Sequence, residues 1–307
     1  MGGERTDMSY QFTSDDKSVQ AAVRRVALDQ IDAAIAEIDD AELPREKAVH
    51  QVRKRCKKLR ALVRLIRPGF ADYARENAAF RDLARTLGGV RDQDVLIETC
   101  NKIGAHYGKD ADAEALEAVQ SALLAEKQDA AKYAALDERL AAFRDGMLQA
   151  RQRAQCWIIE GDGFAALSTG LQKTLKQAAS AMATARYEPA ADHMHEWRKH
   201  MKYHWYHARL LRGIWPATMQ AHVEAASELA DLLGDHHDLT VLRERLTKHP
   251  ERYGGFDAAR MVEKMAARRE EQLAGKIFRR GALLLAERPK ALARRWERYW
   301  QYSRGED

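Results

Sequence analysis

The chain has 307 residues, of which 46% are hydrophobic and 32% charged, and its formal net charge is +5. This length can bury a substantial core as one large domain or two smaller ones, and the composition, with only six prolines, favours a helical globular protein over a fibrous or disordered one. The three cysteines are odd in number and lack C-x-x-C spacing, which argues against a disulfide framework or a cysteine-based zinc site.

The first residues, MGGERTDMSYQFTSDD, contain no apolar signal segment. Nowhere does the chain contain an apolar run of about eighteen residues, the length that a membrane span needs. We therefore expect a cytoplasmic protein without a membrane partner.

Apolar residues recur at three- and four-residue spacing along most of the chain, and Pro or Gly residues separate these segments. The pattern predicts an all-α fold without a linker between independent domains. The expected helices span residues 16–39, 45–67, 71–87, 92–106, 112–153, 163–186, 190–214, 217–233, 239–248 and 257–303.

Residues 50–67, HQVRKRCKKLRALVRLIR, contain eight Lys or Arg and no Asp or Glu. A solvated helix face normally mixes charges of both signs. Because this stretch carries only one sign, it indicates an anionic partner.

The same pattern occurs a second time at residues 195–212, HEWRKHMKYHWYHARLLR. At a constant offset of 145, six polar residues are identical: His50, Arg53, Lys54, Lys57, Arg64 and Arg67 match His195, Arg198, Lys199, Lys202, Arg209 and Arg212. LGGVRDQDVL at 87–96 and LGDHHDLTVL at 233–242 extend the repeat. We therefore predict two similar helical halves, residues 10–153 and 154–304.

On a helix, the repeated basic positions fall within an arc of about 100° and form a stripe about 21 Å long. Like charges held together cost free energy unless an anion or facing carboxylates offset them. A linear, densely charged anion would match two such stripes better than a compact one.

These motifs, two H-x-x-R-K-x-x-K helices and two LG-x-x-x-D segments, resemble those of the conserved histidine α-helical domain family, usually called CHAD. The likeness covers nearly the whole chain and implies a single CHAD domain over residues 10–304. It also implies two four-helix bundles related by a pseudo-twofold axis, with a basic channel between them that binds inorganic polyphosphate.

The resemblance assigns polyphosphate binding to both stripes and to one arginine in the first LG-x-x-x-D segment. The predicted binding residues are His50, Arg53, Lys54, Lys57, Arg60, Arg64, Arg91, His195, Arg198, Lys199, Lys202, Arg209 and Arg212. Lys58 and Arg60 are replaced by Tyr203 and Trp205 in the second half, so its stripe carries less charge. Asp92 and Asp238 are expected to cap helices or to orient a basic residue, because a carboxylate repels phosphate.

Some family members also carry a triphosphatase domain of the CYTH type, marked by E-x-E-x-K, and this motif is absent from the 307 residues. We therefore expect a stand-alone binding module that is not an enzyme and needs no cofactor. By the same resemblance, we expect it to associate with polyphosphate granules.

Two other interpretations compete with polyphosphate binding. The HHD at 236–238 is similar to the His-Asp pair of metal-dependent phosphohydrolases, although the first half keeps only the aspartate. A single-stranded nucleic acid would also suit a basic groove, but the aromatic residues for base stacking occur in the second half only, at Trp197, Tyr203, Trp205 and Tyr206.

Three further histidines, His200, His204 and His207, have the spacing of metal ligands on one helix face. No carboxylate or cysteine partner can be named for them from the sequence. We therefore expect interior hydrogen bonds or exposure beside Trp197 and Trp205, and no metal site.

Overall fold

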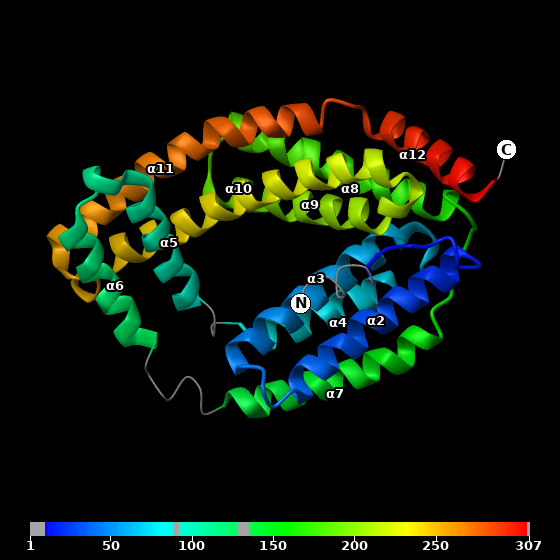
Figure 1. The fold of residues 1–307 in the computed structure, drawn as a ribbon, viewed down its shortest axis with the longest axis horizontal. Coiled ribbons are helices and arrows are strands. Elements are labelled where there is room, and N and C mark those ends of the chain that lie inside the picture. Colours follow the sequence, from blue (N-terminus) through cyan, green and yellow to red (C-terminus); the bar gives the residue numbers. More distant parts are fainter. Residues whose placement is uncertain (1–9, 89–91, 128–134, 306–307) are drawn as a thin grey trace.

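The computed structural model describes residues 10–88, 92–127 and 135–305. Within these ranges every regular element is a helix, which confirms the all-α prediction (Figure 1). None of the described helices is long and apolar enough to cross a membrane.

Four helices form a first bundle: α2 (Val19–Asp39), α3 (Arg45–Leu65), α4 (Tyr73–Thr86) and α7 (Leu136–Gln155). Within it α2 packs against α3 and α7, and α4 also packs against α3 and α7. The N-terminus of α2 is capped by Ser18, whose hydroxyl oxygen accepts a hydrogen bond from the backbone N–H of Ala21 at 3.1 Å.

A second bundle consists of α8 (Ala165–Tyr187), α9 (Ala191–Leu210), α10 (Pro216–Lys248) and α11 (Gly255–Leu284). The last helix, α12 (Pro289–Arg304), packs against α8. α5 (Asp92–Tyr107) and α6 (Ala113–Lys127) precede α7 in the chain, yet they pack against α10 and α11. They lie at the left of Figure 1, away from the first bundle.

The hydrophobic core does not divide at residue 153. One cluster of buried side chains joins the first bundle to parts of α8, α9 and α12. The other joins α5 and α6 to the remaining parts of the second bundle. The two bundles are therefore continuous in their packing, although the sequence repeat separates the chain into halves.

The bundles make direct contact through α3, which packs against both α8 and α9. Gly170 of α8 makes this close approach possible, since a Cβ there would stand 1.8 Å from the carbonyl oxygen of Leu65. The absence of a side chain at Gly170 therefore allows α8 to cross the end of α3 at this residue.

Four predicted helices were wrong. Residues 217–233 and 239–248 form one continuous helix, α10, which contains Gly234 in its interior. The expected helix 257–303 is two helices, because Pro289 cannot continue α11 and instead begins α12. The expected helix 112–153 is also two, since Ala135 is a non-helical residue that precedes α7.

Candidate anion-binding site

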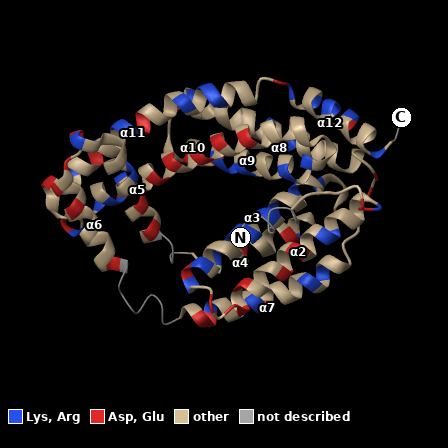
Figure 2. Ribbon diagram, in the orientation of Figure 1, with Lys and Arg blue, Asp and Glu red and all other residues tan. Residues whose placement is uncertain are grey.

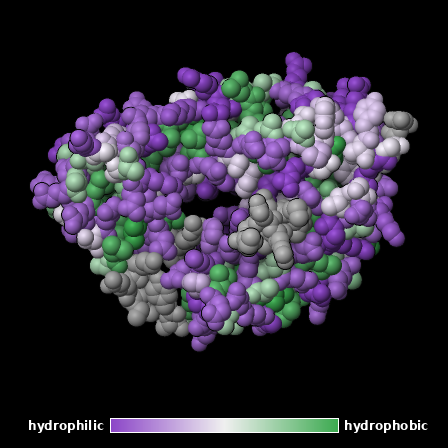
Figure 3. Space-filling view, in the orientation of Figure 1, coloured by the Kyte–Doolittle hydropathy of each residue, from purple (hydrophilic) through white to green (hydrophobic). Residues whose placement is uncertain are grey.

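The two basic stripes lie on α3 and α9, the helices through which the bundles meet. Figure 2 shows Lys and Arg on both helices beside the central opening, and Asp and Glu along the neighbouring α10. In the space-filling view this face of the molecule is deeply hollowed at its centre, where hydrophilic residues predominate (Figure 3).

Two arginines of the α3 stripe, Arg53 and Arg60, donate hydrogen bonds to neutral groups. The Arg53 guanidinium donates a hydrogen bond to the carbonyl oxygen of Leu87 at 2.9 Å. Arg60 donates to the side-chain oxygen of Asn77 at 3.3 Å. Lys54 has no hydrogen bond or ion pair within the described residues. These cations are therefore held without being neutralised by the contacts described.

The α9 stripe differs, because two of its lysines have carboxylate partners. Lys202 donates to Asp231 of α10 at 3.1 Å, and its ammonium also lies 4.6 Å from the ring centroid of Trp205. Lys199 forms an ion pair with Glu196, one turn earlier on the same helix. The charge of the second stripe is thus partly offset within the protein.

Arg198 lies against α10 at Gly234, where a Cβ would be 3.6 Å from its guanidinium. Its repeat equivalent, Arg53, lies 3.7 Å from the Cβ position of Gly88. Both arginines therefore pack beside the glycine of the following LG segment. This matched placement agrees with the sequence repeat.

The two stripes are close enough to influence each other. Burial lowers the pKa of Lys202; Asp231 opposes this shift, whereas Arg198 and Lys54 add to it. Lys54 belongs to α3, so repulsion between like charges acts across the junction of the bundles. A bound anion would relieve this repulsion.

Arg209 and Arg212 lie at the end of the α9 stripe, next to Tyr10 and Gln11 of the N-terminal segment. Arg209 is only 6% exposed and lies among the rings of Trp205, Tyr206 and Tyr10. Burial lowers its pKa to about 10, with Arg212 adding to the shift. Arg212 donates a hydrogen bond to the side-chain oxygen of Gln11 at 3.1 Å. The N-terminal segment thus covers this end of the α9 stripe.

The remaining predicted binding residues differ in their surroundings. His50 is half-buried and Lys57 is exposed. The ring of His195 lies 4.8 Å from that of His237, and its pKa is lowered by burial and then by Arg198 and Lys199. Arg91 lies outside the described residues, so its predicted role stays a prediction.

Sequence reasoning missed the burial of Lys58 and overlooked Asp231. Lys58 is buried beside the ring of Tyr10, and burial, followed by the charge of Arg55, lowers its pKa to about 7. Asp231, Asp235 and Asp238 recur at i, i+4 and i+7 on α10. That periodicity was hidden because a helix break was expected at Gly234. Because α10 continues through Gly234, Asp238 caps no helix. Burial raises the pKa of its carboxyl group, and the nearby Arg198 guanidinium opposes that shift.

The three histidines at metal-like spacing make interior contacts, as expected. The Nε2 atoms of His204 and His222 lie 2.8 Å apart, and His207 Nε2 lies 2.9 Å from the carbonyl oxygen of Ala61. His200 Nε2 lies 2.8 Å from the carboxylate of Glu196. No cluster of three metal-ligating side chains occurs among the described residues.

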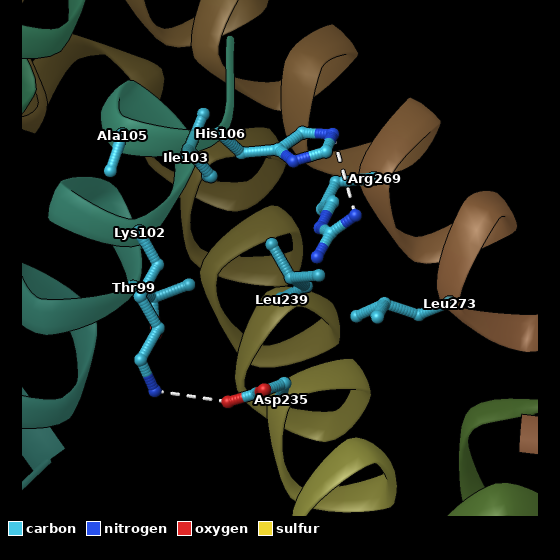
Figure 4. A pocket seen from close by; sticks show the side chains of 9 residues that line it. All are labelled: Thr99, Lys102, Ile103, Ala105, His106, Asp235, Leu239, Arg269 and Leu273. Atoms are coloured by element: carbon cyan, nitrogen blue, oxygen red, sulfur yellow. Dashed lines mark hydrogen bonds and ion pairs between the residues drawn. The ribbon is translucent and has the colours of Figure 1, made fainter. Parts of the chain in front are cut away.

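Beyond the stripes, a cavity of about 370 Å³ lies between α5, α10 and α11 (Figure 4). Leu239 and Leu273 contribute apolar surface, and the Lys102 ammonium donates to Asp235 at 2.9 Å at one end. At the other end, Arg269 Nη1 lies 3.3 Å from His106 Nε2. The Lys102–Asp235 ion pair at this cavity lies about one helical turn along α10 from the Lys202–Asp231 pair.

An all-α protein of two joined bundles, with facing basic helices at their junction, is the class that these observations define. The family model for the CHAD domain matches residues 23–247, well over half of the chain, and the protein therefore belongs to the CHAD domain family. A crystal structure of the CHAD domain from the plant Ricinus communis is similar over 90% of this chain and 92% of that chain, with 18% identity and a TM-score of 0.64. This likeness shows the shared fold. No curated protein matches the sequence.

Proposed function

We propose that this protein binds inorganic polyphosphate in a basic channel between α3 and α9. The proposal depends on one observation: the two basic stripes meet where α3 contacts α9. At this junction, burial and repulsion from Arg198 and Lys54 disfavour the charged form of Lys202. A linear polyanion would lie along both helices and stabilise their charges together. Arginine suits this ligand because its guanidinium can bind phosphate oxygens through two parallel hydrogen bonds.

Nucleic acid has the same backbone charge, but its bases require stacking surfaces. The aromatic residues that would supply them are taken up by packing: Trp197 is fully buried, and Tyr203 and Tyr206 are nearly so. Trp205 lies beneath the cations of Lys202 and Arg209. This arrangement favours a ligand without bases.

The hydrolase interpretation has less support from the side-chain contacts. His236 lies 3.6 Å from the carboxylate of Glu270, and Asp238 shares its surroundings with Arg198. The proposal is therefore a binding protein that is not an enzyme. Binding would let it associate with polyphosphate granules in the cytoplasm.

The test is titration calorimetry of the metal-free protein with long-chain polyphosphate, orthophosphate and a single-stranded RNA, with phosphate release followed in the same samples. We expect tight binding of polyphosphate alone, without release. Phosphate release would support the hydrolase, and tighter binding of RNA would support the nucleic-acid interpretation. Absence of binding would overturn the proposed function.

A further inference from the structure

α10 places carboxylates beside the cations of the candidate site. Asp231 pairs with Lys202 at 3.1 Å, and Asp235 pairs with Lys102 of α5 at 2.9 Å (Figure 4). Asp231 is mostly exposed, with 67% of its side-chain surface accessible, whereas Lys202 is 25% accessible. The aspartate is therefore not required to fill the core. Its contact with Lys202 is electrostatic.

A second carboxylate acts on the same stripe, since Glu196 pairs with Lys199. Two of the lysines predicted to bind phosphate on α9 thus have partners within the protein. An anion that binds there has to replace these partners, and it brings its own negative charge close to them.

The first half of the repeat lacks both carboxylates. At the repeat offsets of 145 and 146 residues, Gln51 stands in place of Glu196 and Arg85 in place of Asp231. Lys54 is the equivalent of Lys199, and it has no ion pair within the described residues. Lys54 and Lys199, equivalent lysines of the two stripes, therefore differ in their internal anions.

Building on the proposed polyphosphate binding, we propose that Asp231 and Glu196 are specificity-determining residues that make the α9 stripe a conditional second half of the site. The polyanion binds first to α3. The α9 lysines join only when phosphates held on α3 are presented at high local concentration and displace the two carboxylates. A small anion contacts too few cations to do so, and the pair of carboxylates therefore selects long chains over short ones.

The experiment is a double-mutant cycle on Lys202 and Asp231, read by calorimetric affinity for long-chain polyphosphate at about 0.15 M salt. The variants of the full-length chain are D231N, K202M and the double substitution. E224Q is the matched control, because it removes one negative charge from an exposed position of α10 about 10 Å along the helix. That separation exceeds the screening length of about 8 Å at this salt concentration.

We expect D231N to raise the affinity about two- to fivefold, in line with the strength of an exposed ion pair, and E224Q to leave it unchanged. K202M should lower the affinity only slightly in the wild-type protein. In the D231N background, K202M should lower the affinity about two- to fivefold. D231N should also raise the affinity for tripolyphosphate by a larger factor than that for the long chain. Because Asp231 is exposed, the variants should remain folded, which circular dichroism can verify.

If wild-type protein binds polyphosphate but D231N has no effect beyond that of E224Q, the conditional role of α9 is wrong while the proposed function stands. Additive effects of K202M and D231N would overturn the proposal in the same way. If wild-type protein does not bind polyphosphate, the proposed function itself fails. A comparison of K54M with K199M gives a second readout. K54M should lower the affinity for polyphosphate more than K199M does.

Discussion

The guanidinium of Arg64, on α3, lies over the ring of Tyr203, on α9, with its Cζ 4.3 Å from the ring centroid. Arg60 approaches the same ring at 5.9 Å. A cation gains energy from the face of an aromatic ring, more so where water is excluded. Tyr203, which replaces the lysine found at the equivalent position of α3, thus holds arginines of the opposite stripe in place.

The ring of Tyr203 should matter more than its hydroxyl group. Tyr203→Ala removes a side chain that is only 6% exposed, and we expect it to lower the free energy of unfolding by about 3 kcal/mol. Tyr203→Phe keeps the ring and should change the free energy of unfolding by less than about 1 kcal/mol. Urea unfolding followed by circular dichroism measures both. Equal losses in the two variants would show that the hydroxyl group is the stabilising part.

Buried histidines should make the protein sensitive to acid. Burial lowers the pKa of His222 to about 4 and that of His207 to about 3, and it lowers the pKa of His204 well below 6.5. Between these values and about 6.5, the unfolded chain binds more protons than the folded one. Each histidine should therefore lower the free energy of unfolding by about 1.4 kcal/mol per pH unit as the pH falls below 6.5.

The measurement is urea unfolding at pH 7.0, 6.0 and 5.0. His222→Gln removes one member of the His204–His222 pair, so it should lower stability at pH 7 and reduce the dependence on pH below 6.5. His249→Gln is the control, because His249 follows the end of α10 and 42% of its side-chain surface is accessible. An unchanged slope in His222→Gln would assign the acid sensitivity to other groups.

Most of the fold could be predicted from the sequence, because helical periodicity and the glycine or proline breaks are local signals. The error at Gly234 occurred where tertiary packing overrides a local signal, whereas the break before Pro289 was a local signal that was missed. Gly234 is a weak helix former, costing about 1 kcal/mol relative to alanine, but α10 is supported along its length by α9, α11 and α5. The repeat equivalent at Gly88 does end a helix, since α4 stops at Thr86.

The basic stripes were found because six residues recur in register, which is a strong signal in one sequence. The carboxylates beside them were not found, because a pairing such as Lys202 with Asp231 depends on how α9 lies against α10. The burial of Arg209 was also hidden, since it depends on the N-terminal segment that crosses the end of α9. Sequence periodicity identifies a helix face, but it does not identify what covers that face.

The crossing of α8 over α3 should depend on one glycine. In Gly170→Ala the new methyl group would collide with the carbonyl oxygen of Leu65, so the helices have to separate. We expect a loss of about 3 kcal/mol or more in the free energy of unfolding. Gly275→Ala is the matched control, because nothing lies within 4 Å of its Cβ position on exposed α11 surface, and it should gain about 0.5–1 kcal/mol. Similar changes in both variants would contradict the close packing.

The proposed site should take up protons when polyphosphate binds. His195 has a lowered pKa in the free protein because of burial and then Arg198 and Lys199, so it is mostly neutral at pH 7. A nearby polyanion would stabilise the charged imidazolium and raise that pKa. The affinity for polyphosphate should therefore increase as the pH falls through the pKa that His195 has in the complex. It should level off below the pKa that His195 has in the free protein.

Calorimetry in buffers of different ionisation enthalpy measures this proton uptake directly. His195→Gln should reduce the uptake, and the measurement should stay within the pH range where the protein is folded. Full uptake in His195→Gln would place the titrating group elsewhere, with His50 the next candidate.

The two stripes together should determine affinity and its dependence on salt. Replacing Arg53, Lys57, Arg198 and Lys202 by Ala removes four cations, two from each stripe, none of which is in the hydrophobic core. We expect polyphosphate binding to be lost while the helical circular dichroism spectrum is retained. In the wild-type protein the logarithm of the affinity should fall steeply with the logarithm of the salt concentration, since binding releases counterions from the polyanion. Removing a single lysine such as Lys54 should lower that slope by roughly one unit. An affinity independent of salt would mean that these cations do not contact the chain.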